Sequence, residues 1–338
     1  MLSCRLLTNY LSSMQFPSFF PRLFHPPVYQ GKRRARNYFE GWYYKHVDAS
    51  GKHIWSIIFG ISHSADAHSF IQVIEGKTGE TDYVRFAPGD FNFDRRELFV
   101  TIGENAIRKD LIRLDLAGEK FSIKGSLGYR EVSAYPQKLL APGIMGWYTY
   151  APFMECYHGV VSMNHTLHGQ LEINGKEVDF TGGKGYIEKD WGRSMPSDWI
   201  WMQCNHFTEA PDASMMISVA RIPWLTGHFP GFLSFFRIGG QVYRFATYNR
   251  SKLDRLVLQP DKVEMELNNR KYVLEVIVER KVSGQLMAPV KGQMERKIAE
   301  SLDADLTVRL SNRNGALIYE GKGEHAGLEI VGDVTKYI

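Results

Sequence analysis

The chain has 338 residues, 44% of them hydrophobic and 23% charged, with a formal net charge of +4. This composition is typical of a globular protein and excludes a disordered or fibrous chain. The small net charge, with basic residues gathered only at 32–36, argues against a nucleic-acid partner. The length is sufficient for two domains with full cores, which is the organisation we expect.

The N-terminal segment 1–28 is expected to form an arm ahead of the folded domains. Four prolines between Pro17 and Pro27 interrupt any signal-type apolar core or amphipathic helix. No stretch of about 18 apolar residues predicts a transmembrane helix, although the aromatic segment 16–24 could touch a membrane surface. The three cysteines have no metal-ligand or redox spacing, and their odd number argues against a disulfide framework. We therefore expect a cytoplasmic protein, with peripheral membrane contact as a possibility.

Beyond the arm, apolar and polar residues alternate with a period of two, and turns rich in Gly, Asn and Asp separate the alternating segments. Long helical stripes are scarce, so the pattern predicts an all-β protein. The first strand carries Glu40, Trp42 and Tyr44 on one face. Further strands are expected at 53–61, 69–75, 98–102, 112–116 and 121–125.

Hairpins and one long loop complete the predicted elements. The segment 134–152 is rich in Pro and Gly and is expected to be a long loop, either a lid over a site or a loop pinned to the surface by Trp147. Helical potential is greatest at 291–301, so a short helix is expected there. Hairpins are expected at 171–180, 263–278 and 307–320, with turns at Asn174-Gly175, Asn268-Asn269 and Asn314-Gly315.

The segment 185–205 places Glu188 and Asp190 among three tryptophans. On an extended strand these two carboxylates project to one side, while Lys189 and Trp191 project to the other. Neighbouring carboxylates raise one another's pKa, and burial among aromatic rings adds to the effect. A neutral glutamic acid here would suit the protonation of an apolar substrate. The alternative is that Lys189, Arg193 or backbone amides pair with both carboxylates at the start of a strand.

The next expected strand places Trp199, Trp201, Gln203 and Asn205 on one face, and the residues between them on the other. If the tryptophan face lines a cavity, that cavity would suit a long isoprenoid or aromatic ligand, with the two amides orienting its polar end. If the face lies against a neighbouring sheet, the tryptophans are ordinary core residues.

Other chemistries lack their sequence signatures. No Gly-x-Ser-x-Gly motif marks a hydrolytic nucleophile, and the histidine pairs do not have the spacing of a metalloprotease helix. Gly182-Gly183-x-Gly185 follows a strand, but Pro196 and the tryptophans replace the helix that dinucleotide binding needs. We expect neither a metal nor a cofactor.

Three motifs follow one another along the chain: Phe39-Glu40-Gly41-Trp42-Tyr43, Glu188-Lys189-x-Trp191-Gly192 and Trp199-x-Trp201-x-Gln203-Cys204-Asn205. In this order they resemble the tocopherol cyclase family. The resemblance extends from about Tyr29 to the C-terminus, where 327–330 is similar to the closing strand of the family. It implies an all-β fold of two tandem lipocalin-like antiparallel β-barrels or sandwiches with few short helices, which we assign to residues 29–183 and 184–338.

The resemblance also implies an activity and a site. Members of the family protonate a prenyl double bond so that a phenolic oxygen captures the cation and closes a chromanol ring, without a redox cofactor. Glu188 is then the expected acid. Asp190 stands where asparagine is usual, and it either raises the pKa of Glu188 or pairs with Arg193. The expected catalytic residues are Glu188 and Asp190, and the expected substrate-binding residues are Glu40, Trp42, Tyr44, His158, Trp191, Trp199, Trp201, Gln203 and Asn205.

Three functions therefore compete, in this order. The first is a cofactor-free cyclase or hydratase acting on a prenylated quinol or related isoprenoid, which needs Glu188 buried, neutral and facing a cavity. The second is a lipocalin-like carrier of an apolar ligand, for which Glu188→Gln would leave affinity within a few-fold. The third is a structural or interaction protein whose tryptophans are core residues, in which case no cavity of roughly 300 Å³ or more should exist among them. The expected partner is an apolar small molecule, and the sequence makes no prediction of the oligomeric state.

Overall fold

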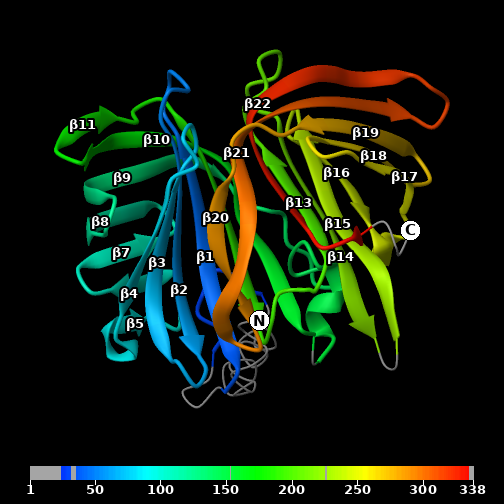
Figure 1. Ribbon diagram of the computed structural model, residues 1–338. Coiled ribbons are helices and arrows are strands. Elements are labelled where there is room, and N and C mark those ends of the chain that lie inside the picture. The colour runs from blue at the N-terminus through cyan, green and yellow to red at the C-terminus, as the bar shows by residue number, and fades with distance from the viewer. Residues whose placement is uncertain (1–23, 32–35, 153, 225–226, 335–338) are drawn as a thin grey trace, which may run out of the picture.

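The computed structural model describes residues 24–31, 36–152, 154–224 and 227–334. Within these residues the chain forms two curved antiparallel sheets side by side, and its helices are single turns of 3-10 type (Figure 1). The prediction of an all-β fold with two lipocalin-like units is confirmed. The 3-10 turns are η1 (Pro88–Asp90), η2 (Gly146–Tyr150) and η3 (Thr247–Asn249).

The first sheet has twelve strands in the order β4-β3-β2-β1-β12-β10-β9-β8-β7-β6-β5, and β11 pairs with β10 outside this path. Strand β1 lies between β2 and β12, so that Glu188 of β12 is opposite Tyr43 of β1. The strands are β1 (Tyr38–Val47), β2 (Ile54–His63), β3 (His68–Glu75), β4 (Thr81–Phe86), β5 (Phe91–Phe93), β6 (Phe99–Ile102), β7 (Asn105–Arg108), β8 (Leu111–Ala117), β9 (Ser122–Ser133), β10 (Cys156–Ile173), β11 (Lys176–Asp179) and β12 (Lys184–Gly192).

The second sheet has ten strands in the order β16-β15-β14-β13-β22-β21-β19-β18-β17, and β20 pairs with β21 outside this path. In Figure 1 the long strand β21 and its partner β20 run between the two sheets. The strands are β13 (Trp199–Cys204), β14 (Ser214–Trp224), β15 (Gly227–Ile238), β16 (Gln241–Ala246), β17 (Lys252–Leu258), β18 (Lys262–Asn268), β19 (Tyr272–Glu279), β20 (Gly284–Val290), β21 (Gln293–Asn312) and β22 (Leu317–Val331).

Each curved sheet is filled by its own apolar core. Trp42 and Tyr44 of β1 belong to the core of the first unit, whereas Ile200 and Met202 of β13 belong to that of the second. These residues sit at every second position because successive side chains of a strand point to opposite faces of its sheet. The interiors of both units are therefore occupied by side chains.

A third apolar cluster lies between the two sheets. It includes Tyr43 of β1, Tyr186 of β12, Trp199 and Trp201 of β13, and Phe235 of β15. Strands β1 and β13 thus bury one face in their own unit and the opposite face between the units. Burial on both faces explains why β13 is apolar without a break over most of its length and buried at every position. The two units share a core at this interface.

The predicted hairpins are present as β10–β11, β18–β19 and β21–β22. The predicted helix at 291–301 is wrong, because the chain turns at Gly292 and continues as strand β21. Strand β21 pairs with both β20 and β22. These ladders override helix propensities that differ by only about 0.7 kcal/mol per residue or less. In the described part of the chain, no helix is long and apolar enough to cross a membrane.

The predicted division between residues 183 and 184 falls inside the first sheet, because β12 pairs with β1 and β10. We propose instead that the first unit ends after Gly192 and that the second begins with β13. Of the predicted arm, residues 1–23 lie outside the described residues. Its end is described, and Val28 is buried beside Tyr29, which belongs to the core of the first unit.

Candidate active site

A pocket lies between the two units, at the third apolar cluster, rather than inside either curved sheet. Its cavity volume is about 180 Å³, which is smaller than the roughly 300 Å³ expected of a ligand cavity among the tryptophans. A water molecule needs about 10–15 Å³ by such a measure, so roughly a dozen would fit, far more than in a packing defect. Its lining includes the apolar or aromatic residues Phe39, Tyr43, Ile58, Phe70, Met145, Tyr148, Trp199, Trp201, Leu233, Leu286 and Ile298 and the polar residues Gln72, Glu155, His158, Glu188, Asp190 and Glu329.

Glu188 of β12 faces this pocket, and its side chain is only 6% exposed. Its Oε2 accepts a hydrogen bond from the hydroxyl of Tyr186 at 2.8 Å and another from Nε1 of Trp201 at 3.1 Å. Tyr186 shares the face of Glu188 because it lies two positions earlier on the same strand. Both donors would stabilise the carboxylate that remains once Glu188 has given up a proton.

His158 of β10 bridges the two carboxyl groups of β12. Its Nδ1 lies 2.9 Å from Oδ1 of Asp190, and its Nε2 lies 3.6 Å from Oε2 of Glu188. The cause is the register of the β10–β12 ladder, in which His158 is directly opposite Asp190. Opposite residues of antiparallel strands share one face of the sheet. Asp190 therefore pairs with His158, a partner that the sequence did not predict for it.

These surroundings change the pKa of Glu188 and the pKa of His158. Burial raises the pKa of Glu188 to about 7, and the charge of Asp190 adds to this, whereas His158 and the two hydrogen-bond donors oppose it. Burial lowers the pKa of His158, but the charges of Asp190 and Glu188 outweigh burial and raise the pKa to about 9. At neutral pH a large fraction of Glu188 thus keeps its proton beside a cationic imidazole.

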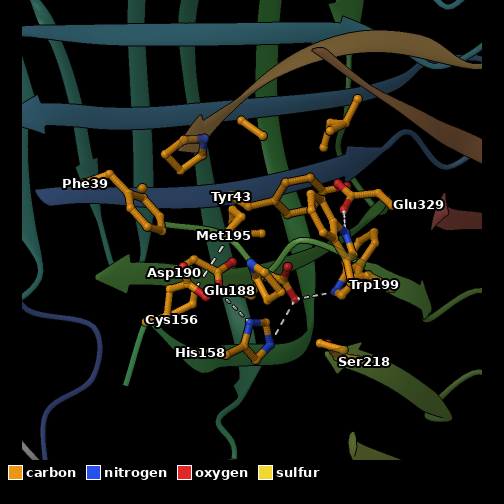
Figure 2. A pocket seen from close by; sticks show the side chains of 18 of the residues that line it. Phe39, Tyr43, Cys156, His158, Glu188, Asp190, Met195, Trp199, Ser218 and Glu329 are labelled. Carbon is orange, nitrogen blue, oxygen red and sulfur yellow. Dashed lines mark hydrogen bonds and ion pairs between the residues drawn. The ribbon is translucent and has the colours of Figure 1, made fainter. Parts of the chain in front are cut away.

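A further carboxyl group, Glu329 of β22, lines the same pocket. Its Oε2 accepts a hydrogen bond from Nε1 of Trp199 at 2.5 Å. Burial raises the pKa of Glu329 to about 8, with contributions from the charges of Glu188 and Asp190. Figure 2 shows His158 and Asp190 on one side of Glu188, and Trp199 with Glu329 on the other.

The arrangement suits proton transfer to an apolar molecule. A neutral carboxylic acid stands in a wall that is otherwise mostly apolar, and the faces of the neighbouring aromatic rings attract positive charge. His158, Glu188 and Asp190 could also each offer one ligand atom to a metal ion, since these atoms lie within 4.8 Å of one another. A metal would need Glu188 as a carboxylate, whereas burial favours its neutral form. That the site holds no metal stays a prediction.

The structure brings Glu188, Asp190, His158, Trp199 and Trp201 together around one pocket. Their roles stay predictions, but their positions agree with the expected grouping of an acid, a second carboxylate and two indoles. The loop 134–152 also contributes side chains to the lining of this pocket.

Within that loop, Met145 and Tyr148 line the pocket. Trp147 is half exposed and does not pin the loop to the surface.

Glu40, Trp42 and Tyr44 do not line the pocket, and their expected substrate-binding role stays a prediction. They lie on the face of β1 that points into the first unit, where Trp42 and Tyr44 are core residues. The intervening residues Gly41 and Tyr43 line the pocket instead. The alternation along β1 was predicted correctly, but which of its two faces meets the second unit was not.

Trp191, Gln203 and Asn205 are also absent from the pocket lining, and their expected role stays a prediction. Trp191 alternates with Asp190, points away from the pocket and stacks on Tyr157 with ring centroids 5.6 Å apart. Asn205 donates a hydrogen bond to the carbonyl oxygen of Gly185 at 2.9 Å. Gln203 is fully buried further along β13.

Sequence reasoning missed Tyr43, Cys156 and Glu329 of the pocket. Glu329 carried a usable signal, because it is a lone acid between Leu328 and Ile330 in an apolar strand segment. Such a residue is buried on one face or the other, and a buried acid calls for a specific partner. Tyr43 and Cys156 carried no comparable signal.

Comparison with known proteins finds a matching family model and relatives that are similar to parts of the chain. Residues 117–332 match the family model described as Tocopherol cyclase-like. A probable chloroplastic tocopherol cyclase of Oryza sativa subsp. japonica is 31% identical over 91 residues, which cover 27% of this chain and 18% of that protein. A chloroplastic tocopherol cyclase of Zea mays is 34% identical over 74 residues, which cover 22% of this chain and 15% of that protein. The matched stretches thus span less than a fifth of either relative.

Solved structures share the fold over most of the chain. A protein assigned as AttH from Nitrosomonas europaea has a TM-score of 0.50 at 14% identity, covering 92% of this chain and 99% of its own. Kievitone hydratase from Nectria haematococca has a TM-score of 0.52 at 10% identity, covering 88% and 90%. CghA in complex with Sch210972 has a TM-score of 0.51 at 10% identity, covering 91% and 89%. At such identities the likeness shows the fold alone.

Proposed function

The chain belongs to the tocopherol cyclase-like family, and from this premise we propose that it is a cofactor-free enzyme that protonates an isoprenoid double bond. The proposed substrate is a prenylated benzoquinol or a related isoprenoid, and the product is a chromanol. One observation carries the proposal. Glu188 is a buried glutamic acid whose pKa is raised to about 7, and it faces an apolar pocket lined by indole rings.

The acid step uses the groups around Glu188. The O–H bond of its carboxyl group breaks as a C–H bond forms at the less substituted alkene carbon, which leaves a tertiary cation. The new carboxylate already has two hydrogen-bond donors, Tyr186 and Trp201, and a cationic His158 at 3.6 Å. These contacts strengthen as charge develops on Glu188, so they favour the transition state over the bound substrate.

The pocket walls stabilise the cation and direct its fate. Trp199, Trp201 and Tyr43 present aromatic rings, and each cation–π contact contributes about 0.5–2 kcal/mol in a desolvated site. When a phenolic oxygen reaches the cation first, a C–O bond forms and the ring closes. When water arrives first, the same acid step gives a hydrated product, so exclusion of water from the pocket selects the cyclase outcome.

The size of the pocket limits what reacts inside it. The volume of about 180 Å³ is below the roughly 300–1,000 Å³ of usual ligand pockets, so we propose that only the reacting end of the substrate lies inside it. A longer prenyl chain would extend beyond the cavity, so we expect the enzyme to tolerate changes in chain length better than bulky substituents on the ring.

The test is incubation of the purified protein with 2,3-dimethyl-6-phytyl-benzoquinol and with shorter prenyl quinols, followed by chromatography and mass measurement. The wild type should form a chromanol of unchanged mass, and Glu188→Gln should not. Glu172→Gln, an exposed change on β10, is the matched control and should keep full activity.

The competing functions predict different outcomes in the same experiment. Unchanged quinol retained equally by the wild type and Glu188→Gln would favour a carrier. The absence of binding by either protein would contradict both the enzyme and the carrier.

A further inference from the structure

A second cavity lies beside the pocket that Glu188 faces. Its volume is about 340 Å³, which falls within the roughly 300–1,000 Å³ of usual ligand pockets. Glu155, Met195 and Pro223 line both cavities, so the two adjoin one another at these residues. We call the second cavity the basic pocket, because its described lining contains four basic residues. They are Arg221 of β14, His228 of β15, Lys291 between β20 and β21, and Arg296 of β21.

The charges around the basic pocket do not cancel. Lys291 and Arg296 form no ion pair with any described residue. Arg221 is partly neutralised, since its Nη1 lies 3.7 Å from Oδ2 of Asp198. Glu155 is the only carboxyl group in the described lining, and burial raises its pKa although the charge of Arg296 opposes the rise. Three cations therefore stand against two carboxyl groups, and this excess favours an anionic occupant.

Neighbouring groups hold both arginines in the wall. Nη2 of Arg221 donates to Nδ1 of His228 at 2.9 Å, so His228 is an acceptor here and adds no positive charge. Nη1 of Arg296 donates to the carbonyl oxygens of Pro196 at 2.9 Å and Ser197 at 3.3 Å. These acceptors are neutral, so Arg296 keeps its charge. An arginine held in this way can present its other N–H groups to an oxyanion with little further loss of side-chain entropy.

Arg296 also connects the two cavities. Its guanidinium carbon lies 5.9 Å from the centre of the Trp199 ring, and Trp199 lines the pocket that Glu188 faces (Figure 2). That pocket is smaller than usual ligand pockets, so a substrate must extend past its wall. A molecule whose double bond meets Glu188 can therefore place a further substituent beside Arg296.

We propose that the basic pocket binds a carboxylate carried by the molecule whose double bond meets Glu188. The inference rests on the proposed function and narrows its substrate to a prenylated phenol with an acidic group on the ring. Arg296 donates hydrogen bonds to the carboxylate, because a guanidinium group matches the two oxygens of a carboxylate. The exposed Lys291 adds a second positive charge. A neutral quinol lacks this contact, so it remains a substrate but binds more weakly.

The test compares two ligands of nearly equal shape that differ in charge, 3-geranyl-4-hydroxybenzoic acid and its carboxamide. Titration calorimetry of the wild type at neutral pH should show at least about 10-fold tighter binding of the acid, because hydrogen bonds to charged groups contribute more than neutral ones. Excess inorganic phosphate should weaken binding of the acid and not that of the amide. Equal affinities for the two ligands would overturn the inference. Binding of phosphate without a preference for the acid would show a site for free anions only, and would overturn it as well.

Variants of the basic pocket separate a binding role from a structural one. Arg296→Gln should lower affinity for the acid about 10-fold and leave affinity for the amide within about two-fold. Arg296→Lys keeps the charge and should recover part of the lost affinity. Lys291→Gln should lower affinity for the acid about 3-fold, whereas Lys252→Gln, an exposed change on β17, should leave both affinities unchanged. Equal losses for acid and amide in Arg296→Gln would show a structural role and overturn the inference.

Turnover is measured separately from binding, so the two proposals can fail independently. Tighter binding of the acid without a chromanol from either ligand would retain the basic pocket and overturn the acid step at Glu188. Chromanol from both ligands with equal affinities would retain the acid step and overturn the basic pocket.

Discussion

Glu188 and Asp190 lie two positions apart on one face of β12, yet their surroundings give them different tasks. The Glu188 side chain is 6% exposed, whereas that of Asp190 is 22% exposed and lies closer to the imidazole of His158. Asp190 is therefore suited to hold His158, and Glu188 is suited to keep a proton for transfer. Two carboxyl groups with different environments are a usual way to divide such roles.

The raised pKa of Glu188 predicts how activity depends on pH. The neutral acid is the active form, so the rate of ring closure should be high below pH 7 and fall as pH rises through about 7. His158 remains cationic across this range, since its pKa is raised to about 9. The measurement is the pH dependence of kcat. A rate that increases through pH 7 would contradict the role of Glu188 as an acid.

Residue-level prediction from sequence succeeded where it depended on strand alternation. Glu188 and Asp190 share one face and Lys189 the other because a strand has a period of two. The partners of these groups were not predictable in the same way. His158 meets Asp190 through the β10–β12 register, and Glu329 reaches the pocket through the β13–β22 pairing, both of which join segments far apart in the chain.

At the scale of elements, β12 is held in place on the face opposite the one that lines the pocket. Nζ of Lys189 lies 2.5 Å from Oε1 of Glu40, and both side chains are fully buried. The same ammonium group donates to the carbonyl oxygens of Pro26 and Val28 at the end of the arm. The backbone amide of Gly31 donates to Glu40. We call this cluster the arm anchor, and it ties the arm, β1 and β12 together directly behind Glu188.

Breaking the arm anchor should be costly. Lys189→Met leaves the carboxylate of Glu40 buried without its counterion, which destabilises a protein by about 3–5 kcal/mol. The matched control is Lys124→Met, which removes an exposed ion pair with Asp115 that contributes at most about 1 kcal/mol. Denaturant unfolding measures both changes. An equal effect of the two substitutions would show that the arm anchor does not hold β12.

Element-level prediction from sequence was uneven for a physical reason. Hairpins with Asn-Gly turns and alternating flanks were found correctly, because turn and strand signals are local. The segment 291–301 was mistaken for a helix because its strand state depends on β20 and β22, which flank it in space. Which face of β1 meets the second unit also depends on residues that are far away in the sequence. For this reason Trp42 was predicted to bind the substrate, although Tyr43 is the residue that lines the pocket.

At the scale of the whole molecule, the three sequence motifs that resemble the family converge on one place. They lie on β1, β12 and β13, and β1 pairs with β12 while β13 faces both from the second unit. The pocket lies where the two units meet, and each unit fills its own interior with side chains. The sequence supported two units but could not show that the pocket needs both.

A pocket between the units predicts the effect of filling it. Ala220 of β14 lines the pocket, and Ala220→Phe should lower activity and ligand affinity at least about 10-fold while the fold is kept, because overpacking costs only about 1–3 kcal/mol. Ala117→Phe, an exposed change on β8, is the control. Ligand affinity and circular dichroism provide the readouts. Unchanged affinity in Ala220→Phe would place the ligand elsewhere, for example inside one of the curved sheets.

The most direct measurement of the central claim is an infrared titration of the carboxyl groups in the wild type and in Glu188→Gln. We expect the neutral carboxyl absorption of the wild type to contain a component that disappears with a midpoint near pH 7. That component should be missing in Glu188→Gln, while the absorption of Glu329, whose pKa is raised to about 8, remains in both proteins. This difference would establish Glu188 as a protonated acid at neutral pH. A carboxyl titration that is identical in the two proteins would mean that Glu188 is already ionised, and the proposed acid step would then have no proton donor at this position.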